Sequence, residues 1–184
     1  KRLIERKITK NILILEKEEK IGCHSSGRNS GVLHAGLYYE PGSLKSKVCV
    51  SGAKRLKNWV IENKLPINCC GKVIVPTEGH HDKQLDELLY RGTANGATVE
   101  MWDEKQLNAL IPEARTASGR ALWSPNTCVV SPLSVLETLR KQLIKNGVIF
   151  LYGELEADFI KFPLSSIKCN LSISLITLCV FKIA

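Results

Sequence analysis

The sequence predicts an α/β protein in which parallel strands are joined through helices. Residues 12–15, ILIL, form a short apolar run that ends at Glu16, and residues 148–152, VIFLY, form a second such run. Continuous apolar runs of this length are typical of parallel strands buried on both faces. An amphipathic helix directly precedes the second run, so we expect the two runs to share one parallel architecture.

The ILIL strand is followed by a loop of small residues and then by a long helix. Residues 25–36 contain three glycines, three serines, an asparagine and a histidine. From 43 to 63, apolar side chains recur at near-helical spacing until Pro66 ends the pattern. This spacing predicts a helix with one apolar face.

The middle third of the sequence mixes strands with short helices, as an α+β domain does. Gly96 ends one predicted helix, and Asp103 caps the next, which Pro112 terminates. The expected strands are 71–76, 99–101 and 119–123, and the expected helices are 82–95 and 104–111.

The last part of the chain resumes the helix–strand pattern and then changes in composition. Ser131 and Pro132 predict a capped helix that runs to Gly147. LSISLITL, residues 171–178, alternates as an appended edge strand would, but for residues 163–184, which are rich in Ser, Ile, Leu and Cys, we favour a tail from a wrong frame or an intron. Their longest uncharged stretch, 169–181, is too short to span a bilayer, so no transmembrane span is expected.

Charge and cysteine content narrow the class of protein. The net charge is +8, but Lys and Arg are scattered among acids, which favours a solvated surface and no nucleic-acid partner. The seven cysteines lack metal-ligand spacing, so we expect reduced, mostly buried thiols and no metal site. Lys1 lies within a pattern already under way and Met101 is the only methionine, so we read the chain as a piece whose targeting signal would lie upstream.

The small-residue loop and Glu16 suggest a site for a nucleotide. Glycines let backbone amides approach phosphate closely, and Ser25, Ser26, Asn29 and Ser30 add short hydrogen-bonding groups. An acid at the carboxyl end of a strand accepts hydrogen bonds from ribose hydroxyls in dinucleotide-binding folds. The G-x-G-x-x-G loop that should precede Glu16 is absent, so spacing alone leaves open that Glu16 is solvated and the glycines only make turns.

Longer strings in the sequence resemble a known family. They are residues 24–52, HSSGRNSGVLHAGLYYEPGSLKSKVCVSG; residues 70–76, CGKVIVP; and residues 119–148, GRALWSPNTCVVSPLSVLETLRKQLIKNGV. Together they resemble the FAD-dependent oxidoreductases of the D-amino-acid-oxidase type, most closely the L-2-hydroxyglutarate oxidases and dehydrogenases. The resemblance covers about residues 3 to 154.

The resemblance implies a fold and a cofactor. The fold would be an incomplete FAD-binding Rossmann-like domain with an inserted α+β substrate domain. Residues 1–65 would be the partial FAD-binding domain, 66–130 the substrate-domain portion, 131–154 the return to the FAD-binding domain and 155–184 an atypical tail. The FAD-binding residues implied are Glu16, Lys17, Ser25, Ser26, Gly27, Arg28, Asn29, Ser30, Gly31, His34 and Gly36.

The activity that the resemblance implies is oxidation of L-2-hydroxyglutarate to 2-oxoglutarate. A base must take the hydroxyl proton, and His34 is the candidate; a structural contact to the flavin and a covalent tether to it are the other roles open to this residue. A dicarboxylate needs cations and hydroxyls at its two ends, for which Tyr38, Tyr39 and Lys45 are candidates.

Other interpretations stay open at the level of sequence. The chain could be a remnant or an interaction module without cofactor, or a related flavoenzyme that acts on glycerol 3-phosphate or an amino acid. The expected compartment is the cytoplasm or the mitochondrion, and the sequence does not indicate the electron acceptor.

Overall fold

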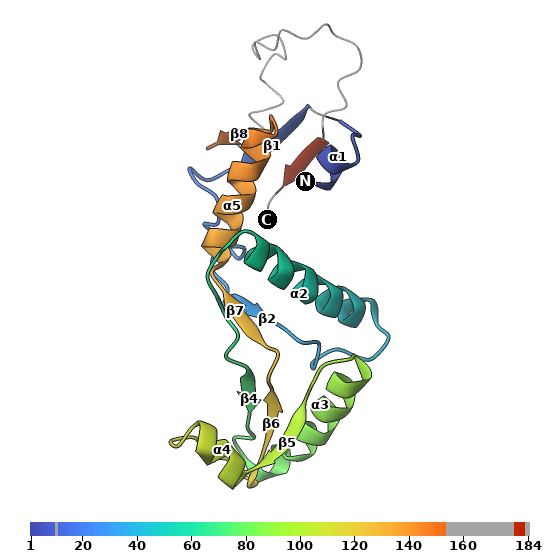
Figure 1. The fold of residues 1–184 in the computed structure, drawn as a ribbon, viewed down its shortest axis with the longest axis vertical. Coiled ribbons are helices and arrows are strands. Elements are labelled where there is room, and N and C mark those ends of the chain that lie inside the picture. The colour runs from blue at the N-terminus through green and yellow to red at the C-terminus, as the bar shows by residue number, and fades with distance from the viewer. Residues whose placement is uncertain (10, 154–178, 183–184) are drawn as a thin grey trace, which may run out of the picture. The chain divides into compact units, whose positions relative to one another are not determined.

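A computed structural model describes residues 1–9, 11–153 and 179–182 (Figure 1). Two compact units are present. The first unit comprises residues 1–29 and the described residues from 132 onward, and the second unit comprises residues 30–131. The second unit is therefore inserted, in sequence, between two parts of the first. The predicted limits of the FAD-binding and substrate domains, at 65 and 130, stay a prediction.

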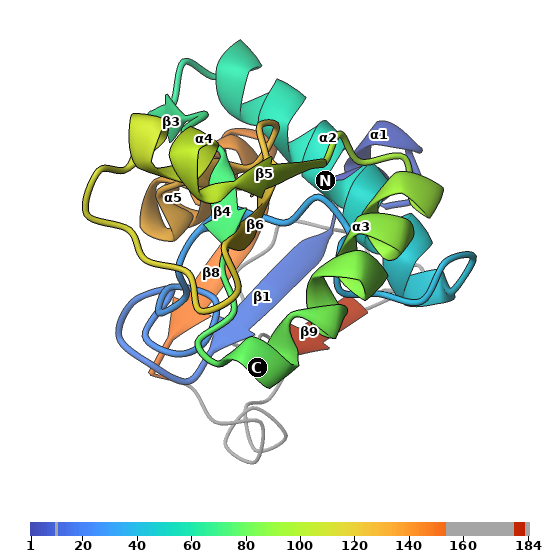
Figure 2. The ribbon, with the colours of Figure 1, turned by 90° about the horizontal axis from the view of Figure 1, so that it is seen from below.

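The first unit is built on a parallel sheet of three strands, in the order β8–β1–β9. β1 (Ile12–Glu16) is the central strand, and Figure 2 shows it between β8 (Ile149–Tyr152) and β9 (Cys179–Lys182). The register pairs Leu13 with Ile149 and Glu16 with Tyr152. The predicted parallel pairing of the two apolar runs is confirmed. β9 was not predicted, and the expected strand over LSISLITL, residues 171–178, lies outside the described residues.

The core of the first unit forms where two helices cover β1. Ile12, Ile14 and Val148 are buried together, with Leu143 of α5 (Pro132–Lys145) and residues of the short α1 (Arg2–Glu5) packed against them. Alternate residues of a strand point to one face, which is why Ile12 and Ile14 share this cluster. β8 is less buried than predicted, because Ile149 is 45% exposed and lies outside the cluster.

The second unit contains two antiparallel sheets of three strands. One has the order β2–β7–β3, formed by β2 (Val32–Leu33), β7 (Cys128–Val130) and β3 (Ile67–Asn68). The other has the order β4–β6–β5, formed by β4 (Lys72–Ile74), β6 (Arg120–Ser124) and β5 (Glu100–Asp103). β6 runs on to β7 through a short turn, so one stretch of chain supplies the central strand of both sheets.

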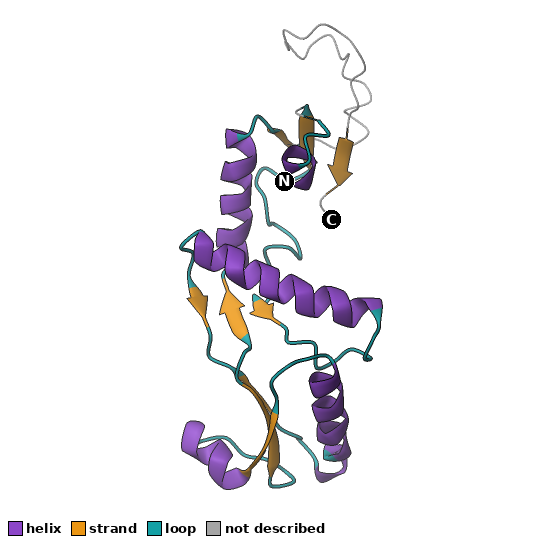
Figure 3. Ribbon diagram, turned by 45° about the vertical axis from the view of Figure 1, so that its right-hand side comes forward, coloured by secondary structure: helices purple, strands orange, loops and turns teal. Residues whose placement is uncertain are grey.

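The long helix α2 (Leu44–Glu62) begins and ends within a residue of its predicted limits. Ser43 caps it by accepting a hydrogen bond from the Ser46 amide at 3.2 Å. α2 contacts β3 near its carboxyl end, where Val60 is fully buried (Figure 3). The predicted apolar face is only partly used, since Leu44 and Val48 in the first half of the helix are 77% and 59% exposed.

The other helices lie against the second sheet (Figure 1). After the short 3-10 helix η1 (Gly79–His81), α3 (Lys83–Ala94) contacts β6, and α4 (Glu104–Leu110) contacts β5 and β6. Asp103 and Gln106 form a reciprocal capping box at the start of α4. The Arg120 guanidinium donates to both Asp82 and Asp86 and lowers the pKa of each carboxyl, so β6 is joined to α3 by charge as well as by packing.

Two tryptophans stack on the sheet of the second unit. The rings of Trp102 in β5 and Trp123 in β6 lie 4.8 Å apart with an interplanar angle of 25°. Gly71 precedes β4 with a φ of +70°, and a Cβ there would lie 2.0 Å from the Trp123 ring. Glycine is therefore needed at position 71 both for the positive φ and for the close packing of the Trp123 indole.

The cysteines differ from expectation in their burial. Cys23, Cys49, Cys69, Cys70 and Cys128 are free thiols, but of these five only Cys128 is buried, and both Cys69 and Cys70 are exposed. These two follow β3 rather than lying within it.

The core of the second unit makes a direct prediction. Leu122 is fully buried in β6 and packs with Leu37 and Leu85. Replacing Leu122 with alanine leaves a cavity and should lower the free energy of unfolding by about 2–5 kcal/mol. Urea unfolding followed by circular dichroism measures the change. The matched control is Leu110→Ala, at a side chain 51% exposed, which should change the free energy by about 0.5 kcal/mol. Equal losses for the two variants would contradict this core.

Candidate functional site

Glu16 is a buried carboxylate at the end of a strand. It is the last residue of β1, and its side chain is 5% exposed. Its Oε1 accepts a hydrogen bond from the Glu18 amide at 3.1 Å, whereas Oε2 has no hydrogen bond from the described residues. Because Oε2 is left open, Glu16 is suited to accept a hydroxyl of a ligand at the carboxyl edge of the sheet.

The loop after β1 folds into a tight turn, and we call it the wound loop. The amides of Gly27 and Arg28 donate to the His24 carbonyl at 3.0 and 2.9 Å, and the Asn29 side chain donates to the carbonyls of Ser25 and Ser26, each at 3.0 Å. A Cβ on Gly27 would lie 2.0 Å from the Gly22 carbonyl oxygen. Glycine is therefore required here by the close approach of two backbone segments.

The same loop lies at the carboxyl edge of the parallel sheet. A Cβ on Gly22 would meet Leu133 at 2.8 Å and Leu136 at 3.1 Å, in the first turns of α5. Since α5 leads into the start of β8, its first turn lies at the opposite, carboxyl end of the strands. The Gly153 amide, just after β8, also donates to the Glu18 carbonyl at 3.1 Å. Glu16 and the loop thus share one sheet edge.

The charged side chains of this loop have separate roles. His24 Nε2 lies 2.6 Å from Glu18 Oε1, and this hydrogen bond lowers the pKa of the Glu18 carboxyl. Lys17 lies 3.9 Å from the same carboxylate. Ser25 and Arg28 are exposed. The edge therefore combines a buried acceptor with an exposed hydroxyl and a guanidinium, a donor and acceptor set that fits the ribose and phosphates of a dinucleotide such as FAD.

A second cluster lies in the second unit and contains His34, Tyr38 and Lys72. The rings of His34 and Tyr38 meet edge to face with centroids 6.0 Å apart. Lys72 Nζ, from β4, donates to the Tyr38 hydroxyl at 2.5 Å and lies 4.6 Å from the centre of its ring. Partial burial, and then the charge of Lys72, lower the pKa of His34, so this imidazole is neutral and can accept a proton at neutral pH.

The turn that carries this cluster is held from two helices. Asn95, at the end of α3, donates to the carbonyls of Gly36 and Tyr39, each at 2.9 Å. The Cys49 thiol of α2 donates to the His34 carbonyl at 3.4 Å. Gly36 has a φ of +95° and a Cβ there would lie 2.8 Å from Val50, so the turn requires glycine. The His34 carbonyl and the turn that follows it are thus fixed.

The structure gathers some of the predicted site residues and leaves others apart. His34 and Tyr38 are together, but the Lys45 side chain is exposed and makes no ion pair within the described residues. Tyr39 enters the turn through its backbone. The Gly31 carbonyl is taken by the Val130 amide at 3.0 Å, and Ser30 is exposed.

Lys72 and Asn95 are the residues that sequence reasoning missed. Lys72 is the cation of the cluster, yet it lies in the apolar string GKVIVP, which we read only as a strand. A lone lysine inside such a run is the signal that could have pointed to it, since a charged residue in a buried segment needs a reason. Asn95 reads as an ordinary helix end, and its sequence context holds no comparable signal.

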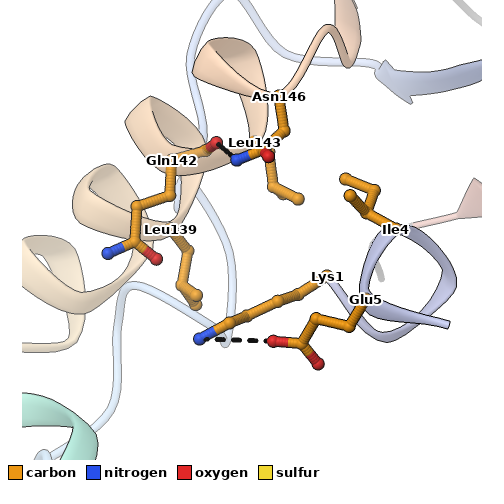
Figure 4. Close-up of a pocket in the computed structure, with 7 residues that line it drawn as sticks. All are labelled: Lys1, Ile4, Glu5, Leu139, Gln142, Leu143 and Asn146. Carbon is orange, nitrogen blue, oxygen red and sulfur yellow. Dashed lines mark hydrogen bonds and ion pairs between the residues drawn. The ribbon is translucent and has the colours of Figure 1, made fainter. Parts of the chain in front are cut away.

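The first unit also contains a hollow of about 160 Å³ between α1 and α5 (Figure 4). Its walls are largely apolar, from Ile4, Leu139 and Leu143, and an ion pair of 3.9 Å between Lys1 and Glu5 lies at its side. No predicted site residue lines it. Over the described ranges, no helix combines the length and the apolar character needed to cross a bilayer. The same ranges hold no cluster of three or more potential metal ligands.

The fold is shared with solved oxidases. The chain superimposes on an L-alpha-glycerophosphate oxidase from Mycoplasma pneumoniae with FAD bound, with a TM-score of 0.70 and 21% identity, over 78% of this chain and 44% of that one. A glycine oxidase from Geobacillus kaustophilus gives a TM-score of 0.69 at 15% identity, over 78% and 40% of the two chains. At such identities the likeness defines the fold class alone.

The chain belongs to the family of FAD dependent oxidoreductases, whose model matches residues 2–160. It is 36% identical over 172 residues to the mitochondrial L-2-hydroxyglutarate dehydrogenase of Caenorhabditis briggsae, and these cover 93% of this chain but 37% of the relative. It is 33% identical over 142 residues to the L-2-hydroxyglutarate dehydrogenase of Escherichia coli, which is 77% of this chain and 33% of the relative. The chain thus spans about a third of the length of these curated relatives. The family predicted from the sequence is confirmed.

The environment of His34 predicts its titration. The pKa of His34 should lie below that of an ordinary histidine. Lys72→Met should raise this pKa by removing a nearby positive charge, but partial burial of the ring should still hold it below the ordinary value. Folding stability should be complete above the ordinary histidine pKa and should decrease as the pH falls toward the lowered one, because the unfolded chain binds the proton more readily.

NMR titration of the imidazole signals, with His34 assigned by its loss in His34→Gln, measures this pKa. Lys83→Met, at an exposed lysine of α3, is the charge-matched control and should leave the titration unchanged. An ordinary pKa for His34 in the unmodified chain would rule out the proposed burial of the ring.

Proposed function

We propose that this chain is part of an FAD-dependent oxidoreductase that oxidises L-2-hydroxyglutarate to 2-oxoglutarate. The observation that carries the proposal is the cluster of His34, Tyr38 and Lys72, in which a neutral imidazole lies beside a cation. Oxidation of a 2-hydroxy acid requires the protein to supply a base and a group that binds the substrate carboxylate. The relatives from Caenorhabditis briggsae and Escherichia coli carry the name L-2-hydroxyglutarate dehydrogenase, which supports this substrate.

The first unit would hold the adenosine side of FAD. Glu16 would accept the ribose hydroxyls through Oε2, the oxygen that lacks an internal donor. The wound loop would face the phosphates with Ser25, Arg28 and Lys17, the more exposed members of the predicted set. On this proposal the parallel sheet is the Rossmann-like part of the protein, and residues 66–130 belong to a substrate domain inserted into it.

Four further residues stay predicted cofactor contacts. They are Ser30, Gly31, His34 and Gly36, which follow the wound loop directly in sequence. The positive φ of Gly36 turns the backbone beside His34. The His34 ring would then act on the substrate, while the His34 carbonyl accepts the hydrogen bond from the Cys49 thiol.

His34 would act as the base. A ring nitrogen of the neutral imidazole would take the hydroxyl proton of the substrate, and the lowered pKa keeps the ring in the accepting form at neutral pH. FAD, when bound, supplies the redox chemistry by accepting a hydride from the carbon that carries the hydroxyl. Fixing the His34 carbonyl through Cys49 would orient the ring for this transfer.

Lys72 and Tyr38 would bind a carboxylate of the substrate. Lys72 is charged and already donates to the Tyr38 hydroxyl, so an arriving carboxylate could take a hydrogen bond from each. Tyr39 and Lys45 stay candidates for the second carboxylate. We place the protein in the mitochondrion or the cytoplasm, since the nematode relatives are named mitochondrial and the family also occurs in bacteria.

The role of Glu16 can be tested by binding alone. Glu16→Gln removes the charge but keeps the shape, and it should weaken FAD binding about 10-fold to 100-fold, the worth of hydrogen bonds to a charged acceptor. Calorimetric titration of the chain with FAD measures this change. Glu19→Gln, at an exposed acid of the same loop, is the control and should bind FAD as the parent does. Equal binding by Glu16→Gln and the parent would refute the ribose contact.

The substrate can be tested by dye reduction in FAD-loaded protein. L-2-hydroxyglutarate should reduce the dye, and Lys72→Met should raise the KM for it about 10-fold or more, while kcat changes less. Lys83→Met is again the control. Reduction by glycerol 3-phosphate or an amino acid, but not by L-2-hydroxyglutarate, would overturn the assigned substrate. A chain that takes up no FAD at all would instead favour a remnant without cofactor.

A further inference from the structure

Two cysteines lie opposite each other across the first sheet of the second unit. β3 and β7 are antiparallel, with Ile67 opposite Val130 and Asn68 opposite Val129. Beyond β3 the two segments stay side by side, since the Gly71 amide donates to the Thr127 carbonyl at 3.0 Å, and continuing the register by one residue brings Cys69 opposite Cys128. Residues directly opposite each other in antiparallel strands have Cα atoms about 4.5–5.5 Å apart. That separation lies within the range of about 4.4–6.8 Å that a disulfide spans.

The two thiols differ in access to solvent. The Cys128 thiol donates to the Asn126 carbonyl at 3.5 Å, and both Cys69 and the Lys57 ammonium of α2 lie close enough to influence its pKa. Cys128 is 1% exposed, whereas Cys69 is exposed. Peroxide can therefore reach one sulfur directly and the other only through its neighbour.

Lys57 supplies a positive charge to both sulfurs. Interactions with Cys128 and Cys69 raise the pKa of Lys57, so the side chain stays protonated. Burial raises the pKa of Cys128 and the ammonium opposes this effect. An ammonium beside a thiol stabilises the thiolate, which is the form that reacts.

We propose that Cys69 and Cys128 are a modification site. Peroxide converts this cross-strand pair reversibly into a disulfide with the help of Lys57. In the first step the Cys69 thiolate attacks one oxygen of hydrogen peroxide. The O–O bond breaks, the sulfur becomes a sulfenic acid, and the other oxygen leaves as water once protonated. In the second step Cys128 attacks this sulfur and water leaves again. Two thiols and one peroxide thus give one disulfide and two waters.

Cys70 provides an internal comparison. It is adjacent to Cys69 and is also exposed, but its thiol donates to the Gly71 carbonyl at 3.5 Å rather than to another sulfur. If exposure alone decided reactivity, Cys70 and Cys69 would be modified alike. The position opposite Cys128 is what distinguishes Cys69.

The test is oxidation of the whole chain with a small excess of hydrogen peroxide, followed by alkylation of the remaining thiols, digestion and mass spectrometry. We expect a peptide pair joined through Cys69 and Cys128, lighter than its reduced form by the two lost hydrogens and released by dithiothreitol. Cys69→Ser, at an exposed side chain, should abolish the pair. Cys70→Ser is the matched control and should retain it.

The charge of Lys57 has a separate readout. Lys57→Gln should slow the formation of the disulfide several-fold at neutral pH, and raising the pH should restore the rate. The disulfide yield in Cys70→Ser shows whether the geometry holds independently of this rate. The proposal is overturned if Cys69 ends as a sulfinic acid with Cys128 still reduced, or if the recovered disulfide joins Cys70. Neither outcome depends on FAD binding or turnover.

Discussion

The parallel pairing of β1 with β8 is the contact on which the rest of the first unit depends. The strands come from opposite ends of the described sequence, yet Leu13 faces Ile149 and Glu16 faces Tyr152 in one register. Because α5 must lead into the start of β8, its first turn comes to lie at the carboxyl edge, where the loop after β1 packs against Leu133. The buried acid and the wound loop share an edge as a consequence of this one pairing.

In the second unit, the cluster of His34, Tyr38 and Lys72 lies among short strands. β2 and β3 contain two residues each, too few to fix a site by sheet hydrogen bonds alone. Asn95 and Cys49 supply the missing restraint by binding the carbonyl of His34 and the turn that follows it. Arg120 performs a similar task farther away by joining β6 to the aspartates of α3. Side chains from helices thus fix the position of backbone segments that the short strands alone would leave unrestrained.

Local signals in the sequence predicted the helices closely and the site only in part. Ser43, Asp103 and Gly96 act through neighbours a few residues away, so the limits of three helices could be read within about a residue. His34 and Tyr38 are likewise near each other in sequence. Lys72 reaches them only because β4 pairs with β6, and Cys69 meets Cys128 only through the register of β3 with β7. Such long-range pairings leave no mark in a local pattern, and β9 was missed for the same reason.

The stacked indoles of Trp102 and Trp123 have a practical consequence. The sequence has three tryptophans, Trp59, Trp102 and Trp123, and all belong to the second unit. Intrinsic tryptophan emission therefore originates in that unit alone, and the stacked pair ties part of it to the alignment of β5 with β6. Emission from the first unit has only tyrosine as its source, so the two halves of the protein carry optically distinct reporters of their own folding.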